Sequence, residues 1–245
     1  PADINKLDQF ALGDSQKIWY ERVSGRPGAE LEPQELATLR PKVHQHMSES
    51  HADSVFVKTH SLLAEDRGVP LITMDCTAGA IYVVRNPMDV AVSLTHHLGV
   101  TVDQAIELMA DPNGRSFADP VNVDQVFGSW SLHVHSWTHA PTPSLHVIRY
   151  EDMLTKPMTA FQSVAAFLGL EPPQERLSGA IEFSSFDVLR DQEQRHGFRE
   201  KSMFAEAFFR SGTAAQWRKI LSASQVDAVL GAHRDQMERF GYLPA

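Results

Sequence analysis

The chain has 245 residues, and its 22 Lys and Arg against 31 Asp and Glu give a formal net charge of −9 at pH 7. This acidic balance argues against a general nucleic-acid binder, which needs a broad positive surface. Hydrophobic residues make up 42% and charged residues 22%, which is typical of a globular chain with a sizeable core. No apolar run is long enough for a membrane span, and the first ten residues lack the basic segment of a signal peptide. The single Cys76 excludes an internal disulfide. We therefore expect a soluble, cytoplasmic protein with no nucleic-acid or membrane partner.

Short apolar runs rich in β-branched residues alternate with longer amphipathic segments. The runs 55–57, 80–84 and 145–148 predict buried strands. The longer segments predict helices over 87–98, 101–109, 127–139, 157–168 and 225–240. Strands separated by helices of this size pair in parallel through right-handed crossovers. We expect an α/β fold, with a central parallel sheet flanked by helices, in a single domain over residues 1–245.

The clearest local pattern runs from the 80–84 strand into a helix. Arg85 follows the strand, Asn86 is a suitable N-cap, and Pro87 suits the first helical position. Arg85 would therefore stand at the carboxyl edge of the sheet beside unpaired helix N–H groups, where open α/β sheets bind anions. Ser93 lies two helical turns after Asn86 on the same face. The alternative is a surface arginine paired with a carboxylate and a serine without a role.

A second candidate site is Lys58-Thr59-His60, at the end of the 55–57 strand. Residues two apart on a strand project to the same side, so a fixed cation would lie beside a group that titrates near neutrality. Such a pair can take a proton from a hydroxyl and stabilise charge on a leaving group. A hydrogen-bonded structural histidine is the alternative.

A third candidate is a mixed-charge stretch between Ser184 and Gly212. It contains Phe186 and ends in Phe208-Phe209-Arg210-Ser211-Gly212, where the glycine allows backbone N–H groups to approach an anion closely. A solvated surface loop is the alternative here.

These segments, taken in order with Arg149-Tyr150-Glu151-Asp152, resemble the cytosolic-type sulfotransferases that use 3′-phosphoadenosine 5′-phosphosulfate (PAPS). The Arg-Asn-Pro-x-Asp-Val-x-x-Ser element at 85–93 is the specific one, and the resemblance extends from about Val55 to Tyr242. It implies a fold related to the P-loop nucleotide kinases. It also implies a reaction that moves a sulfuryl group to a hydroxyl of a small molecule and leaves 3′-phosphoadenosine 5′-phosphate (PAP). By analogy with in-line phosphoryl transfer, we expect no metal.

The resemblance also implies roles for individual residues. His60 would be the general base, and Lys58 would lie beside the transferring group. Arg85 and Ser93 would bind the 3′-phosphate, and Arg210, Ser211 and Gly212 would close over it. Tyr150, Ser184 and Phe186 would surround the adenine. Ser211 stands where the family has a lysine, so one cation is lost from this element.

The family also carries a phosphate-cradling loop on its first strand, and the interval from Pro1 to Val57 contains none. We expect this loop to precede Pro1 in the intact gene product, and the chain without it to be inactive. Some family members dimerise through a Lys-x-x-x-Thr-Val-x-x-x-Glu element, to which the segment 218–227 is only loosely similar, so a homodimer is left open.

Two alternatives of a different class remain at this stage. A P-loop kinase relative is disfavoured by Lys58-Thr59-His60 and by the lack of a magnesium-binding carboxylate at a strand end. A non-catalytic nucleotide-binding relative is favoured only by the missing loop and Ser211. His133, His135 and His139 do not share a helical face, which disfavours a metal site.

Overall fold

The computed structural model describes residues 3–140 and 142–244, which fall into two compact units. Unit 1 contains Pro1–Leu7, Gly79–Met109 and Pro141–Ala245, and unit 2 contains Asp8–Ala78 and Ala110–Ala140. Each unit is described by itself, and the assignment of both to one domain stays a prediction. None of the helices in the described part of the chain is both long and apolar enough to cross a membrane.

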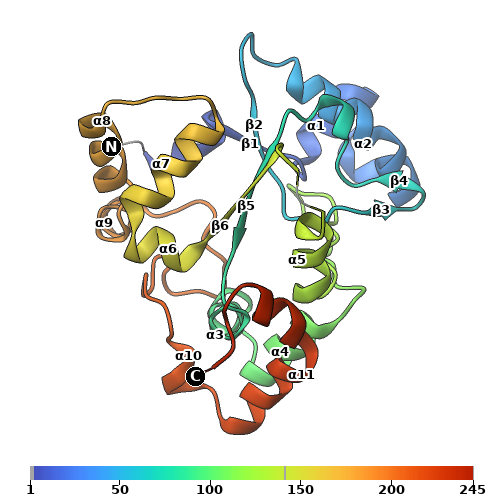
Figure 1. Cartoon of the computed structure of the whole chain (residues 1–245). Helices are drawn as coiled ribbons and strands as arrows, with labels where there is room; N and C mark the ends of the chain where they lie inside the picture. The colour runs from blue at the N-terminus through green and yellow to red at the C-terminus, as the bar shows by residue number, and fades with distance from the viewer. Residues whose placement is uncertain (1–2, 141, 245) are drawn as a thin grey trace. The chain divides into compact units, whose positions relative to one another are not determined.

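Unit 1 is built on a parallel pair of strands, β5 (Ala80–Val84) and β6 (Leu145–Arg149), which run side by side in register from Ala80 opposite Leu145 (Figure 1). Its helices are α3 (Pro87–Leu98), α4 (Val102–Ala110), α6 (Tyr150–Thr155), α7 (Pro157–Phe167), α8 (Gln174–Phe183), α9 (Phe186–His196), α10 (Trp217–Ile220) and α11 (Ala223–Arg239). Its core includes Val84 on β5, Met88 and Val92 on α3, and Val229 and Met237 on α11, each 1% exposed or less.

Helix α3 begins and ends where local sequence dictates. The Asn86 side chain accepts a hydrogen bond from the Met88 N–H at 2.9 Å, and Pro87 occupies the first helical position. Gly99 closes the helix in the left-handed conformation with φ of 68°. The predicted bounds of this helix and of β5 are confirmed.

Unit 2 pairs β1 (Ala11–Gly13) with β2 (Phe56–Lys58) in parallel, and β3 (Glu65–Asp66) with β4 (Val69–Pro70) in an antiparallel hairpin. Its helices are α1 (Lys17–Ser24), α2 (Pro33–Ser48) and α5 (Trp130–Thr138), and short 3-10 helices span Gly28–Glu30 and Met74–Cys76; another, Ile4–Gln9, runs from unit 1 into unit 2. Side chains of α1 and α2 form an apolar core with Leu31 and Val123, which lie outside these helices: Trp19, Tyr20, Leu36, Val43 and Met47.

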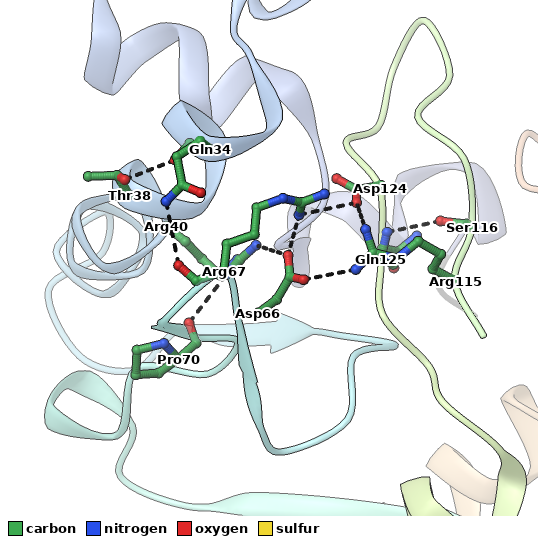
Figure 2. Close-up of polar contacts among 10 residues, drawn as sticks. All are labelled: Gln34, Thr38, Arg40, Asp66, Arg67, Pro70, Arg115, Ser116, Asp124 and Gln125. Atoms are coloured by element: carbon green, nitrogen blue, oxygen red, sulfur yellow. Dashed lines mark hydrogen bonds and ion pairs between the residues drawn. The ribbon is translucent and has the colours of Figure 1, made fainter. Parts of the chain in front are cut away.

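A cluster of charged side chains fixes the β3–β4 hairpin within unit 2 (Figure 2). The Asp66 carboxylate forms ion pairs with Arg67, with Arg115 at 2.8 Å and with Arg40 at 3.9 Å. Arg115 also pairs with Asp124 at 3.0 Å. The cluster therefore ties α2, the hairpin and the 115–124 segment together, and each arginine in it has a carboxylate partner.

Other sequence predictions fared unevenly. The expected helices at 101–109, 127–139, 157–168 and 225–240 exist as α4, α5, α7 and α11, although α5 begins only at Trp130, where Ser129 caps it. The prediction of buried strands was wrong about burial at 55–57, and at 80–84 it was wrong for Val83, which is 50% exposed. Phe56 is 48% exposed and Val57 43% exposed, because β1 is the only strand paired with β2 in the described residues.

Candidate functional site

Unit 1 contains a cavity of about 730 Å³ at the carboxyl ends of β5 and β6. The eight residues predicted to bind the nucleotide all line it: Arg85, Ser93, Tyr150, Ser184, Phe186, Arg210, Ser211 and Gly212. They come from the end of β5, from α3, α6 and α9, from the residue that follows α8, and from the loop over 197–216 that follows α9. The fold thus gathers residues up to 127 positions apart, Arg85 and Gly212, around one space.

Arg85 lies in the cavity wall, and among the described residues no carboxylate pairs with it. Its guanidinium lies 4.4 Å from the centre of the Tyr150 ring, a cation–π contact. Its Nε is buried and has no hydrogen-bond partner within residues 3–140 and 142–244. Because an unsatisfied buried donor costs free energy, an acceptor oxygen placed beside this nitrogen would be stabilising.

The turn that carries Arg85 is braced by Glu151. One carboxylate oxygen accepts the Asn86 N–H at 3.0 Å, and the other accepts the Tyr242 hydroxyl at 2.8 Å. The same hydroxyl lies 3.2 Å from the Val84 carbonyl oxygen. The last residue of β5 and the cap of α3 are therefore fixed by groups from α6 and from the C-terminal segment.

Two independent features of the site require a glycine at position 212. Its φ of +59° lies in the left-handed region, which strains other residues. A Cβ there would also lie 2.3 Å from the Phe186 ring, so the ring packs directly on the glycine backbone. Phe186 in turn contacts Phe209 edge-on, with ring centres 6.2 Å apart.

Two buried carboxylates hold the ends of the Arg210-Ser211-Gly212 element. Glu193 on α9 accepts the N–H groups of Phe208 at 2.7 Å and Phe209 at 2.9 Å. Asp89 on α3 accepts those of Ala215 at 2.6 Å and Trp217 at 3.1 Å. Arg210 itself donates to Gln216 at 2.6 Å and pairs with no carboxylate among the described residues. The backbone is thus anchored on both sides while the arginine keeps its charge uncompensated.

Lys58 and His60 belong to unit 2 and are not among the residues that line the cavity. Both side chains are exposed at the end of β2. The His60 carbonyl oxygen lies 3.2 Å from His133 Nε2, and the Ser61 carbonyl accepts the Trp137 indole N–H at 3.1 Å. Helix α5 therefore positions the segment that follows Lys58.

Asp14 supports the same segment from β1. Its N–H donates to the Lys58 carbonyl at 3.2 Å, and its carboxyl hydrogen-bonds the Thr59 side chain. Burial raises the pKa of this carboxyl from 3.8 to about 6, while the Thr59 hydroxyl and the Arg40 charge oppose the rise.

The His133-His135-His139 set has a structural explanation. His133 contacts the His60 backbone, and burial lowers its pKa, while His135 and His139 stack with ring centres 5.1 Å apart. Within the described residues no group of three or more His, Cys, Asp or Glu is arranged to hold a metal ion.

A sequence model of the sulfotransferase domain matches residues 18–241, nearly the whole chain and every residue of the cavity. The chain belongs to the sulfotransferase domain family. Rat sulfotransferase 2A1 is 26% identical over 167 residues, which cover 66% of this chain and 58% of the relative. Dog sulfotransferase 1A1 is 27% identical over 198 residues, which cover 76% and 62%. The matches thus span about three fifths of these relatives' length.

Solved structures confirm the α/β fold of this sulfotransferase family member. Mouse sulfotransferase SULT7A1 complexed with PAP superposes with a TM-score of 0.59 at 20% identity, covering 96% of this chain and 89% of that one. Retinol dehydratase in complex with androsterone and the inactive cofactor PAP gives 0.58 at 21% identity, covering 96% and 64%.

The side chains that line the cavity suit a nucleotide with a 3′-phosphate on its ribose, such as PAP. Three hydrogen-bond donors there are suited to phosphate oxygens: the Arg85 Nε, the Arg210 guanidinium and the Ser93 hydroxyl. Sequence reasoning found these residues but missed Asp89 and Glu193. Asp89 lies within the 85–93 motif, which was a usable signal, whereas nothing local to Glu193 indicates its bonds.

Proposed function

We propose that this protein transfers a sulfuryl group from PAPS to a hydroxyl of a small-molecule acceptor. The observation that carries the proposal is the gathering of all eight predicted nucleotide residues around one cavity. Two arginines there have no carboxylate partner in the part of the chain that the structure describes. Membership of the sulfotransferase family supports the reaction class.

In this proposal the cavity residues bind and orient the nucleotide. Arg85, Ser93 and Arg210 donate to the 3′-phosphate, and the backbone at Ser211 and Gly212 closes over it. Tyr150, Ser184 and Phe186 surround the adenine, since aromatic rings supply flat apolar faces for a base. The anchoring of the loop by Asp89 and Glu193 presets its shape, so less ordering is needed when the nucleotide binds.

Bound PAPS would supply a sulfuryl group attached to a phosphate leaving group. We assign to His60 the removal of the acceptor's hydroxyl proton, which requires a neutral imidazole. The Lys58 ammonium would stabilise the negative charge that develops during transfer. The support for these two assignments is their family resemblance and their exposure at the end of β2.

The acceptor class is an alcohol or phenol of small-molecule size. The similar structures of retinol dehydratase hold androsterone in one case and retinol in another, and both ligands carry a hydroxyl. A homodimer and a cytoplasmic location stay predictions.

The test incubates the full-length protein with donor carrying a radioactive sulfuryl group and a panel of phenols, alcohols and sugars. We expect label on at least one acceptor class, and at least a hundredfold lower rate for His60→Ala with unchanged nucleotide binding, as loss of a general base predicts. Equal transfer by His60→Ala would overturn the base assignment. Nucleotide binding by calorimetry without transfer to any acceptor would favour a non-catalytic binding protein.

A further inference from the structure

A histidine that has no role in the proposed function also lines the nucleotide cavity. His96 lies three residues after Ser93 on α3, so the two side chains share one helical face, and both contribute to the cavity wall with Arg210 and Ser211. His96 is exposed to solvent at this wall. A ligand bound at Ser93 and Arg210 would therefore come within reach of the imidazole.

We propose that His96 is a titratable binding residue for the 3′-phosphate of the nucleotide, which it holds in its protonated form. The inference rests on the proposed function, because it assumes that this phosphate occupies the Arg85, Ser93 and Arg210 end of the cavity. It goes further in making the affinity for the nucleotide dependent on pH through this chain's own histidine.

The charges around His96 explain why its protonation follows ligand binding. Partial burial and the nearby Arg210 guanidinium lower the pKa of His96 below its ordinary value, and Glu206 acts in the opposite direction. Neutral imidazole therefore predominates near pH 7 when the cavity holds no anion. A phosphate between His96 and Arg210 would reverse this balance, because two negative charges favour the imidazolium and screen it from the arginine.

Three other titratable or charged groups line the cavity within residues 3–140 and 142–244. Arg85 follows β5, Tyr150 begins α6, and His97 lies beside His96 on α3. His97 also lines the cavity and shares the Ser93 face, so it needs its own control.

Because Ser211 carries no charge, a positive charge on His96 would matter more for phosphate binding. It is neutral and hydrogen-bonds Thr213 at 2.8 Å, so the element that closes the cavity supplies one fixed cation, Arg210. A protonated His96 would add a second positive charge beside it. Because charge-assisted hydrogen bonds to phosphate are the strong ones, this addition is large enough to measure.

The experiment measures binding of PAP and of adenosine 5′-monophosphate, which lacks the 3′-phosphate, by calorimetry at pH 6 and pH 8. We expect His96→Gln to weaken PAP binding about tenfold at pH 6, which corresponds to one pKa unit of coupling. The same variant should have little effect at pH 8 or on the monophosphate. Wild type should take up more protons on binding PAP than His96→Gln does, as shown by titrations in buffers of different ionisation enthalpy.

Three further variants sharpen the outcome. His96→Lys, a fixed cation, should bind PAP at pH 8 as tightly as at pH 6, apart from the titration of the phosphate itself. His97→Gln should retain most of the pH dependence, and His196→Gln, which lies outside the cavity, should retain all of it. Equal binding of PAP by wild type and His96→Gln at pH 6, or equal losses for both nucleotides, would overturn the proposal while leaving the proposed function intact. Failure of wild type to bind PAP at either pH would overturn both.

Discussion

The two arginines at the cavity of unit 1 and the three arginines at the β3–β4 hairpin of unit 2 differ in what surrounds them. In unit 2, Arg40, Arg67 and Arg115 share the Asp66 carboxylate, and Arg67 and Arg115 also reach Asp124 (Figure 2). In unit 1, Arg85 stacks on an aromatic ring and Arg210 is held by an amide. Guanidinium groups neutralised by carboxylates fasten chain segments together, whereas those held by neutral groups keep their charge available for an anion. The surroundings of an arginine, more than its presence, therefore distinguish a structural role from a binding role.

The largest expected effect is on the structural side of this comparison. Asp66→Asn removes the charge shared by three arginines, of which Arg40 has a side chain only 9% exposed. Since a nearly buried charge loses its partner, the free energy of unfolding should fall by roughly 3 kcal/mol, measured by urea denaturation. Asp187→Asn, which breaks an exposed pair with Arg190, should change it by less than about 0.5 kcal/mol. Similarly small losses of unfolding free energy in both variants would contradict a structural role for the Asp66 cluster.

On the binding side, Arg85→Gln should separate affinity from stability. The variant loses a charged donor to phosphate, so PAP binding should weaken about a hundredfold, while the free energy of unfolding changes by less than about 1 kcal/mol. Arg115→Gln is the matched control, with the opposite pattern of lower stability and unchanged PAP affinity. A large stability loss in Arg85→Gln would place Arg85 among the structural arginines.

Asp14 provides a pH-dependent test of the unit 2 interior. Its pKa is raised to about 6 in the fold, so the native state binds its proton more tightly than the unfolded chain does. Its contribution to stability is therefore present below about pH 4 and is lost as pH rises toward 6. Asp14→Asn keeps an acceptor for Thr59 without the charge, so its free energy of unfolding relative to wild type should rise by about 2 kcal/mol between pH 4 and pH 7. If the difference in unfolding free energy between Asp14→Asn and wild type does not change with pH, the raised pKa of Asp14 is contradicted.

The smallest effect concerns the anchoring of the 197–216 loop. Glu193→Gln keeps one acceptor oxygen but loses the charge that holds the Phe208 and Phe209 N–H groups. PAP affinity should fall about fivefold, because the loop must then be ordered on binding. Glu175→Gln on the exposed start of α8 should leave affinity unchanged. An unchanged affinity in Glu193→Gln would mean that the loop is set by other contacts.

The sequence was most informative where structure is local. Asn86-Pro87 and Gly99 defined α3, and the β-branched run at 80–84 defined β5. The bracing of the site depends instead on partners far along the chain, such as Asp89 with Ala215, 126 residues apart, and Glu151 with Asn86, 65 apart. The hydrophobic periodicity of the sequence does not indicate which distant residues pair. The burial of 55–57 was mispredicted for a related reason, since the exposure of a strand depends on its neighbours in the sheet.

The most direct test of the central claim is a crystal structure of the chain with PAP. We predict the adenine between Tyr150 and Phe186, and 3′-phosphate oxygens within hydrogen-bond distance of Arg85 and Ser93 Oγ. A 3′-phosphate bound away from these groups, or a nucleotide phosphate seated on the Arg40, Arg67 and Arg115 cluster, would contradict the distinction drawn between the two sets of arginines.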